Sequence, residues 1–429
     1  MTYSETLEFL YSQLPAYHRV GKVAYRNNLC NTEKLDEYFG RPHRKYMTVH
    51  VGGTNGKGSV SHMTASILQQ AGYKTGLYTS PHLKDFRERI RVDGEVIEEE
   101  YIVEFVQNHR AILESLKPSF FEMTAAMAFE YFAAQEVDIA VVEVGMGGRL
   151  DSTNVISPIV SVITNIGHDH MEFLGDTLEK VAIEKAGIIK PHTTVVIGEA
   201  IETTENIFKS AARISGSEIF FADKTFESSL ADLNILEPFR NYTVTEKETG
   251  KTFNGAISLG GDYQAANLRT VFQTWRCLEK KLNISEEALS EGIKNVIRNT
   301  GLQGRWQILR HKPVVICDTG HNFEGLKYVL GQINKISVGK RRLVLGFVND
   351  KDVDKILPLF PKDAIYYFTK ASIPRAMDED VLKKKASEAG LYGDSFPSVE
   401  GAYNAALADS DASDLIFIGG STFVVAEVL

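Results

Sequence analysis

The stretch YMTVHVGGTNGKGS, residues 46–59, decides the fold, because an apolar, β-branched run leads directly into a glycine-rich loop with one lysine and one serine. The run 46–51 favours a buried strand, and residues 59–70 have helical character that ends just before Gly72. Glycines permit positive φ and close backbone approach, so consecutive N–H groups can point at one anion beside a helix N-terminus. The stretch therefore predicts a phosphate-binding loop between a strand and a helix.

Lys57 and Ser59 supply the chemistry that such a loop needs. Lys57 would neutralise the outer phosphates, and Ser59 could reach a phosphate or a bound magnesium ion. The usual pattern G-x-x-x-x-G-K-[ST] would require glycine at Val51 and a hydroxyl residue at Gly58, so the loop is a variant. The alternative is a glycine-rich turn with one exposed lysine, but the order strand, loop, helix favours phosphate binding.

Length and composition restrict the class of protein. A chain of 429 residues is too long for one ordinary core, and 43% hydrophobic with 24% charged residues is typical of globular proteins. The net charge of −9, without a basic run, gives no support to nucleic-acid or membrane binding. The three cysteines are widely spaced, which favours reduced thiols over disulfides. The N-terminus lacks an apolar core of signal-peptide length. We therefore expect a cytoplasmic protein.

Strands and helices alternate along the chain, which predicts parallel sheets. In the first 298 residues we expect strands at 46–51, 75–79, 138–144, 159–164 and 194–197, helices at 98–116, 121–134, 177–185 and 264–282, and a hairpin at 241–258. After a break at 299–304 we expect strands at 314–317, 343–347, 365–368 and 415–418. The predicted fold is therefore α/β, with a large P-loop-type, mostly parallel domain (1–298), a linker (299–304) and a smaller Rossmann-like domain (305–429).

Polar residues follow the predicted strands of the large domain, where open α/β sheets bind ligands. Ser80, Glu143 and the group His168, Asp169 and His170 each come just after a strand. A hydroxyl and a carboxylate beside bound phosphates suit magnesium, which prefers hard oxygen donors. Each has an alternative: Ser80 as a turn hydroxyl, Glu143 as a helix-capping carboxylate, and the histidines as satisfied loop residues.

For four further residues, the chemistry of the side chain alone does not assign one role. Lys185 reads as a solvated cation near a helix C-terminus. Asp318 could accept from ribose hydroxyls or structure a turn, and His321 could contact a base or phosphate. Arg305 could meet phosphate or pair with a surface carboxylate.

A series of motifs runs through the chain in order: GGTNGKGS, TSPHL, FRERI, EVGMGGRLDSTN, DHMEFLG, EKAGIIK, GRWQ, DTGHN and the pair Arg375-Ala376. In order and spacing this series resembles that of the folylpolyglutamate synthases, members of the Mur ligase superfamily whose bifunctional bacterial form is also a dihydrofolate synthase. The resemblance runs from about residue 20 to the C-terminus.

The resemblance implies roles for individual residues. For ATP it implies Gly53, Thr54, Asn55, Gly56, Lys57, Gly58, Ser59, Asn267, Arg305, Asp318 and His321. For metal it implies Ser80, Glu143 and His170; for catalysis it implies Lys57, Lys185 and His170; and for the pterin substrate it implies Phe86, Arg89, Arg149, Asp151 and Asn154. It further implies Mg²⁺, allows K⁺, and identifies Lys185 with a lysine that is carbamylated, which replaces the reading of a solvated cation.

The chain departs from the family's pattern at two places. Arg87 stands where many relatives have Asn, and Thr319 stands where Gly is usual, because DTGHN replaces DGAHN. The first departure lies near the pterin region and leaves the preferred substrate less defined than the use of nucleotide.

The implied reaction is ATP-dependent addition of L-glutamate to dihydropteroate or to the γ-carboxylate of a reduced folate, through an acyl phosphate, by a monomer that binds small molecules only. Two alternatives stay open: a Mur-type ligase for a peptidoglycan precursor, and a P-loop nucleotide switch. A switch would need no second ATP-contacting module.

Overall fold

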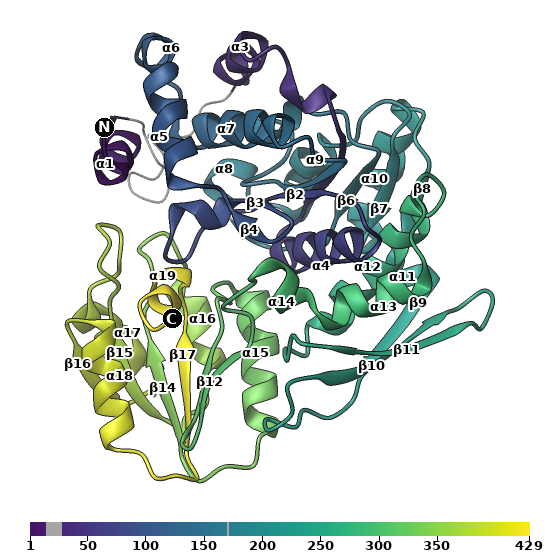
Figure 1. Ribbon diagram of the computed structural model, residues 1–429. Helices are drawn as coiled ribbons and strands as arrows, with labels where there is room; N and C mark the ends of the chain where they lie inside the picture. Colours follow the sequence, from purple (N-terminus) through teal and green to yellow (C-terminus); the bar gives the residue numbers. More distant parts are fainter. Residues whose placement is uncertain (14–27, 170) are drawn as a thin grey trace. The chain divides into compact units, whose positions relative to one another are not determined.

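The computed structural model describes residues 1–13, 28–169 and 171–429. The chain forms two compact units (Figure 1). Unit 1 contains Met1–Ser229, Asn241–Ile257 and Ala265–Gly301, and unit 2 contains Leu230–Arg240, Ser258–Gln264 and Leu302–Leu429. The polypeptide therefore passes between the units several times.

The main sheet of unit 1 has eight strands in the order β4-β3-β2-β5-β1-β6-β7-β8. Its strands are β1 (Met47–Gly52), β2 (Thr75–Tyr78), β3 (Ile90–Val92), β4 (Glu95–Val96), β5 (Ile139–Glu143), β6 (Val160–Ile163), β7 (Thr194–Ile197) and β8 (Ile219–Phe221). The six strands from β2 to β8 are parallel, whereas β3 and β4 are antiparallel. The predicted mostly parallel sheet is confirmed.

Helices cover both faces of this sheet, which is why β5 is an unbroken apolar run up to Glu143. In Figure 1, α4 (Lys57–Gln70) and α7 (Phe120–Ala134) lie on opposite faces. Tyr78, Ala140 and Val142 point into a core with α7, while α4 packs on the sheet and on α13 (Glu286–Lys294). The strand that carries the phosphate loop, β1, lies inside the sheet between β5 and β6.

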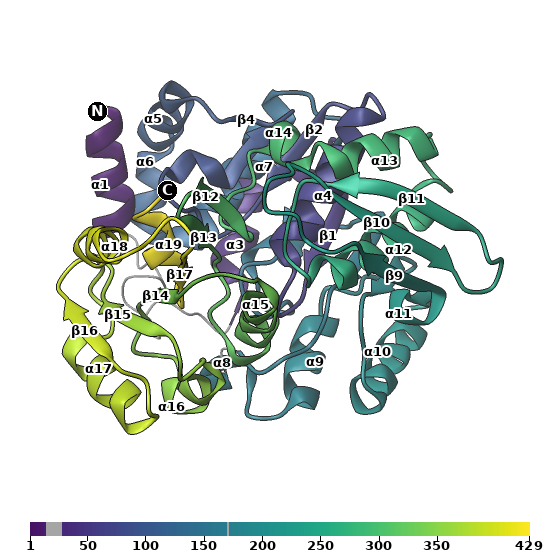
Figure 2. The same cartoon turned by 90° about the horizontal axis from the view of Figure 1, so that it is seen from below.

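The remaining helices of unit 1 surround the sheet. They are α1 (Tyr3–Gln13), α3 (Cys30–Tyr38), η2 (Pro42–Arg44), η3 (Phe86–Arg89), α5 (Glu99–Asn108), α6 (Arg110–Leu116), η4 (Ser152–Val155), α8 (Met171–Leu174), α9 (Leu178–Ala186), α10 (Glu202–Ile214), α11 (Ala222–Thr225), α12 (Gln264–Leu278) and α14 (Val296–Thr300). Figure 2 shows β9 (Phe226–Leu230), β10 (Arg240–Glu246) and β11 (Thr252–Ile257) side by side, and these form a separate three-stranded sheet.

Unit 2 is built on a six-stranded sheet in the order β12-β13-β17-β14-β15-β16, parallel except at β12. Its strands are β12 (Gln307–His311), β13 (Val314–Cys317), β14 (Arg341–Leu345), β15 (Ile365–Thr369), β16 (Gly393–Phe396) and β17 (Leu415–Gly419). Its helices are α15 (Phe323–Lys335), α16 (Val353–Ile356), η5 (Leu357–Leu359), α17 (Glu379–Glu388), α18 (Val399–Ala408) and α19 (Thr422–Ala426).

Alternate residues of β13 face two different cores of unit 2. Val314 and Ile316 pack with α15 and α17, and Val315 and Cys317 pack with α18 and α19. A strand buried on both faces needs apolar residues throughout, which explains the run VVIC.

Some predictions of local structure were wrong. The window 98–116 is two helices, α5 and α6, which meet at His109. The segments Leu230–Arg240 and Ser258–Gln264 belong to unit 2, so the compact units do not follow the contiguous ranges 1–298 and 305–429, and the linker at 299–304 stays a prediction.

Within the described part of the chain, no helix is both long and apolar enough to cross a membrane.

Candidate active site

Two glycines give the loop after β1 its shape. Gly53 has φ +140° and Gly56 has φ +85°, whereas Gly52 ends β1 and Gly58 lies in α4 with ordinary negative φ. A Cβ atom on Gly53 would lie 1.9 Å from Oγ1 of Thr164, and one on Gly56 would lie 2.3 Å from Oδ1 of Asn267. The loop therefore needs glycine twice, and Asn267 of α12 lies against the second of these glycines; its contact with ATP stays a prediction.

Residues just after β6 hold the loop in place. Asn165 accepts from Thr54 N–H (3.0 Å, at its carbonyl) and from Asn55 N–H (2.9 Å, at Oδ1), and the Thr164 hydroxyl donates to the carbonyl of Asn55 at 2.6 Å. Sequence reasoning missed Thr164 and Asn165, although Thr164 is the last residue of the predicted strand 159–164 and Asn165 follows it directly, at the edge of the sheet where ligands bind.

Helix α4 begins at Lys57, earlier than the predicted start at Ser59, so Lys57, Gly58 and Ser59 form its first turn. Gly56 is its N-cap, and no side chain caps it. The N–H groups of a first helical turn have no partner within the helix, which makes this end suitable for an anion. Lys57 is half-buried, and its Nζ donates to the carbonyl of Thr54 at 3.2 Å.

A second lysine, Lys185, contacts the loop from α9. It lies near the end of α9, is 4% exposed, and its Nζ donates to the carbonyl of Gly53 at 2.7 Å. Burial, reinforced by the charge of Lys57, lowers the pKa of Lys185 to about 7, although Asp169 and Asp151 act in the opposite direction. The initial reading of a solvated cation is wrong, because the amine is buried against the phosphate loop.

Glu143 and Ser80 stand side by side at the carboxyl ends of β5 and β2. Oε2 of Glu143 accepts from Ser80 N–H at 3.0 Å, and the carboxylate is buried. It caps no helix. A buried carboxylate and a nearby hydroxyl are the hard oxygen donors that Mg²⁺ prefers, so these residues fit a divalent ion. His170, the third predicted ligand, lies outside the described residues, among which no cluster of three or more His, Cys, Asp or Glu side chains forms a metal site.

The loop after β5 is tied to Asp151. Asp151 accepts from Met146 N–H (2.9 Å), Thr153 N–H (3.0 Å) and the Thr153 hydroxyl (2.5 Å). Burial raises the pKa of Asp151, and these hydrogen bonds oppose that change. Asn154 donates to the carbonyls of Arg149 and Gly187, both at 3.0 Å, and thus closes the same loop.

Arg149, Phe86 and Arg89 complete the predicted pterin set. The half-exposed Arg149 pairs with Glu184 at 2.8 Å. Phe86 and Arg89 are 2% and 3% exposed, and Nε of Arg89 donates to Nδ1 of His82 at 2.7 Å. The Arg89 guanidinium also lies 5.1 Å from the ring centre of Phe120.

In unit 2, Asp318 organises the turn after β13. Its Oδ2 accepts from the Tyr263 hydroxyl and from Trp306 N–H, and its Oδ1 accepts from Gly320 N–H, all at 2.7 Å. The turn reading of Asp318 is therefore confirmed, and a contact with ribose stays a prediction. Arg305 donates to the Thr319 hydroxyl, and Nδ1 of His321 lies 3.0 Å from the Thr319 carbonyl.

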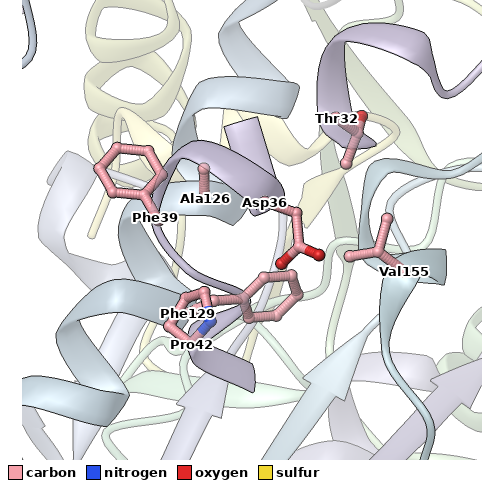
Figure 3. A pocket seen from close by; sticks show the side chains of 7 residues that line it. All are labelled: Thr32, Asp36, Phe39, Pro42, Ala126, Phe129 and Val155. Atoms are coloured by element: carbon pink, nitrogen blue, oxygen red, sulfur yellow. The ribbon is translucent and has the colours of Figure 1, made fainter. Parts of the chain in front are cut away.

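A pocket lies between α3, α7 and η4, and none of its lining residues is a predicted site residue (Figure 3). Its lining is Thr32, Asp36, Phe39, Pro42, Ala126, Phe129 and Val155, and its volume is about 10 Å³. That is the space of about one water molecule, so the pocket is too small for a substrate.

Comparisons with known proteins agree with this geometry. The Mur ligase middle domain matches residues 51–274, and the Mur ligase glutamate ligase domain matches residues 304–422. A probable bifunctional folylpolyglutamate synthase/dihydropteroate synthase of Haloferax volcanii is 32% identical over 100% of this chain, which spans 50% of that relative. Folylpolyglutamate synthase of Lacticaseibacillus casei is 31% identical, with 88% of each protein covered.

Solved structures show the same relationship. Folylpolyglutamate synthase of Thermotoga maritima is 32% identical with a TM-score of 0.81, covering 99% of this chain and 95% of the other. E. coli FolC in complex with DHPP and ADP is 28% identical with a TM-score of 0.84, covering 100% and 97%. A bifunctional folylpolyglutamate synthase/dihydrofolate synthase with Mn, AMPPNP and L-glutamate bound is 25% identical with a TM-score of 0.83, covering 100% and 97%. The phosphate loop, the two-unit α/β fold and these matches together assign the chain to the folylpolyglutamate synthase/dihydrofolate synthase family of the Mur ligase superfamily.

Proposed function

We propose that this chain is an ATP-dependent ligase that adds L-glutamate to dihydropteroate, to the γ-carboxylate of a reduced folate, or to both, and releases ADP and phosphate. Family membership supports the reaction class. The ligands of two solved relatives, DHPP with ADP and Mn with AMPPNP and L-glutamate, are the classes of small molecule that we extend to this chain.

The contact between Lys185 and Gly53 is the observation that carries the proposal. A P-loop switch has no need of a buried lysine beside its phosphate loop, whereas in a ligase this lysine, once carbamylated, would supply an anionic oxygen ligand close to the proposed metal ion and substrates. At a pKa of about 7 a large fraction of Lys185 is neutral at physiological pH, and a neutral amine can add to CO₂. The N–C bond forms, one π bond of CO₂ breaks and the nitrogen loses one proton, so the neutral amine becomes a carbamate with two oxygens and one negative charge.

The residues that we propose for ATP are the ones that the family resemblance implies. In unit 1 they are Gly53, Thr54, Asn55, Gly56, Lys57, Gly58, Ser59 and Asn267, and in unit 2 they are Arg305, Asp318 and His321. Ser80, Glu143 and His170 would hold a divalent ion, which when bound would neutralise charge on the phosphoryl oxygens. Phe86, Arg89, Arg149, Asp151 and Asn154 belong to the pterin region in this proposal.

The reaction then proceeds in two steps. The acceptor carboxylate attacks the γ-phosphorus of ATP, an O–P bond forms, and the bond to the bridging β–γ oxygen breaks, so ADP leaves. Lys57 stabilises the charge that develops on the phosphoryl oxygens. The α-amine of glutamate then attacks the acyl phosphate, the C–N bond forms, phosphate leaves and the amine loses a proton. The loop holds the reacting groups in line, which supplies much of the rate.

The experiment is a coupled assay of ADP release, with dihydropteroate and tetrahydrofolate compared in the presence and absence of L-glutamate. We expect glutamate-dependent release with at least one of them. Release without any acceptor would favour a nucleotide switch, and release only with a UDP-linked peptidoglycan precursor would favour that ligase class. The same assay with and without K⁺ tests whether the enzyme uses this ion. Light scattering gives the molar mass and tests the predicted monomer. Fractionation of the source cells tests the predicted cytoplasmic location.

Lys57→Ala tests the phosphate loop directly. Loss of a positioned cation at the transferring phosphoryl group should lower kcat by about 10²–10³-fold. Lys45→Ala is the matched control, because Lys45 is an exposed lysine just before the same strand and should keep full turnover. Unchanged turnover in a folded Lys57→Ala protein would contradict the assignment of the loop.

A further inference from the structure

Three buried polar side chains form a continuous line from β1 to the loop after β5, and the mechanism above does not use two of them. His50 lies in β1, three residues before Gly53, and its Nε2 is 2.8 Å from the Thr153 hydroxyl oxygen. The same hydroxyl is 2.5 Å from Oδ1 of Asp151. His50 and Thr153 are fully buried, and Asp151 is 6% exposed.

The direction of these hydrogen bonds follows from counting protons. The Thr153 hydroxyl has one proton, and a 2.5 Å separation from a carboxylate is typical of an O–H···O⁻ bond, so that proton points to Asp151. The hydroxyl oxygen must then accept, and His50 is its donor through Nε2–H. Burial, and secondarily the charge of Lys190, lowers the pKa of His50 to about 3, so the ring carries a single proton. Nδ1 of His50 has no hydrogen-bond partner among the described residues.

Asp151, at the other end of this chain of hydrogen bonds, holds the loop after β5, which belongs to the proposed active site. Oδ2 of Asp151 accepts from Met146 N–H at 2.9 Å, and a hydrogen bond from Gly145 N–H also lowers the pKa of Asp151. Gly145 is two residues past Glu143. A Cβ atom on Gly145 would lie 2.4 Å from Cζ of Phe121, so the loop backbone lies directly on that ring and has little freedom to move.

We propose that His50 and Thr153 are positioning residues, which orient the Asp151 carboxylate and through it hold loop 145–147 in the shape that receives the pteridine-bearing substrate. The proposal rests on the proposed function, because it takes the 145–154 region as part of the substrate site. The simpler alternative is that His50 is a core histidine whose single hydrogen bond only stabilises the fold. The two ideas differ in their effect on the KM of one substrate.

Two matched pairs of variants test the proposal. His50→Met keeps the length of the side chain without a donor, whereas His50→Gln keeps an N–H near the position of Nε2. Thr153→Val removes the hydroxyl at equal size, and Thr153→Ser keeps it. We expect the Met and Val variants to raise the KM for dihydropteroate or tetrahydrofolate about tenfold, the usual scale for loss of an outer-shell partner, with the KM for ATP unchanged. The Gln and Ser variants should stay close to the unaltered protein.

Equal changes in both KM values, or a lower melting temperature with both KM values unchanged, would overturn the proposal in favour of a purely structural histidine. If both apolar variants fail to fold, the unaltered protein still tests the direction of the hydrogen bond on which the proposal depends: ¹⁵N NMR of histidine-labelled enzyme, with His50→Gln for assignment, should show a neutral Nε2–H ring that does not titrate between about pH 5 and 8. An Nδ1–H ring or a titrating one would overturn it. This measurement needs no activity, so absence of glutamate-dependent ADP release would refute the proposed function without deciding the tautomer.

Discussion

At the scale of single residues, two lysines donate to adjacent carbonyls of the phosphate loop. Nζ of Lys57 contacts the carbonyl of Thr54, and Nζ of Lys185 contacts that of Gly53. The charge of Lys57 is the second cause, after burial, of the low pKa of Lys185. Conversion of Lys185 to a carbamate would replace this repulsion by attraction, which is a physical reason for the modification at this position.

Carbamylation of Lys185 predicts a pH dependence with a definite sign. The amine must be neutral to react, so occupancy should fall as the pH drops below about 7, and added bicarbonate should restore it. With ¹³C-bicarbonate we expect a carbamate signal in the NMR spectrum that is lost in Lys185→Gln and kept in Lys190→Gln, a nearby partly buried lysine that donates to the carbonyl of Asn154. Lys185→Ala should lose activity that short carboxylates partly restore. Full activity of Lys185→Ala would rule the carbamate out.

Thr319 is the residue where this chain departs from the DGAHN pattern, and the structure gives it three contacts. Its N–H donates to the carbonyl of Gly304 at 3.0 Å, its hydroxyl accepts from Arg305, and its carbonyl faces Nδ1 of His321 at 3.0 Å. The residue therefore contacts two of the candidates for nucleotide contact in unit 2, Arg305 and His321.

Removal of the Thr319 hydroxyl should free the Arg305 side chain without changing the backbone. Thr319→Val is therefore expected to raise the KM for ATP several-fold, within the roughly 10–100-fold range for lost outer-shell partners, and Thr319→Ser should not. Initial-rate kinetics against ATP check this, with the KM for glutamate as the internal control. An unchanged KM for ATP in Thr319→Val would show that Arg305 needs no support from this hydroxyl.

At the scale of elements, β1, the loop and α4 act as one unit, and Gly56 is one of two loop positions where a Cβ atom would clash. Gly56 and Gly72 have nearly equal φ values, +85° and +87°, but only Gly56 has a neighbour where a Cβ would stand. Both alanine substitutions should lower the free energy of unfolding by about 1–2 kcal/mol, the cost of a left-handed L-residue. Only Gly56→Ala must also displace Asn267, so only this variant should raise the KM for ATP.

Chemical denaturation gives the two stabilities, and ATP kinetics give the two KM values. Comparison with Gly72→Ala thus separates the effect of backbone strain on stability from the effect of a changed loop shape on ATP binding. If both variants bind ATP equally well, the contact between Gly56 and Asn267 has no role in nucleotide binding.

Sequence patterns predicted strands that are buried throughout, and also the hairpin 241–258, whose strands have mixed burial but flank a turn; they missed β9, which has neither feature. The apolar run of β5 is buried throughout, so its composition alone indicates a central strand. In β9, FESSL, only Phe226 is fully buried, and such a strand has no clear signature. Local sequence also cannot show that Asn267 contacts Gly56 or that Tyr263 donates to Asp318, because these pairs form only when distant segments meet.

At the scale of the whole molecule, unit 2 is completed by two segments that precede it in the chain. Arg240 donates to the carbonyls of Ala231 (2.6 Å) and Gly260 (2.9 Å) and pairs with Asp262 at 2.8 Å. Gln332 of α15 donates to the Gly260 carbonyl at 2.8 Å. Leu233, Ile235 and Tyr263 pack against the core of α15 and β13.

A fragment consisting of residues 305–429, cut at the predicted linker, should therefore not fold on its own. It would lack the apolar side chains of the two earlier segments, and the buried Asp318 would lose the hydrogen bond from the Tyr263 hydroxyl. Loss of one partner from a buried charged group costs about 1–3 kcal/mol or more, a large part of the stability of a small domain. Circular dichroism of the fragment should show no cooperative thermal transition, whereas the full chain should. In hydrogen exchange on the full chain, Leu230–Arg240 and Ser258–Gln264 should be protected together with β13. A fragment that melts sharply at the temperature of unit 2 would show that these two segments contact unit 2 without stabilising it.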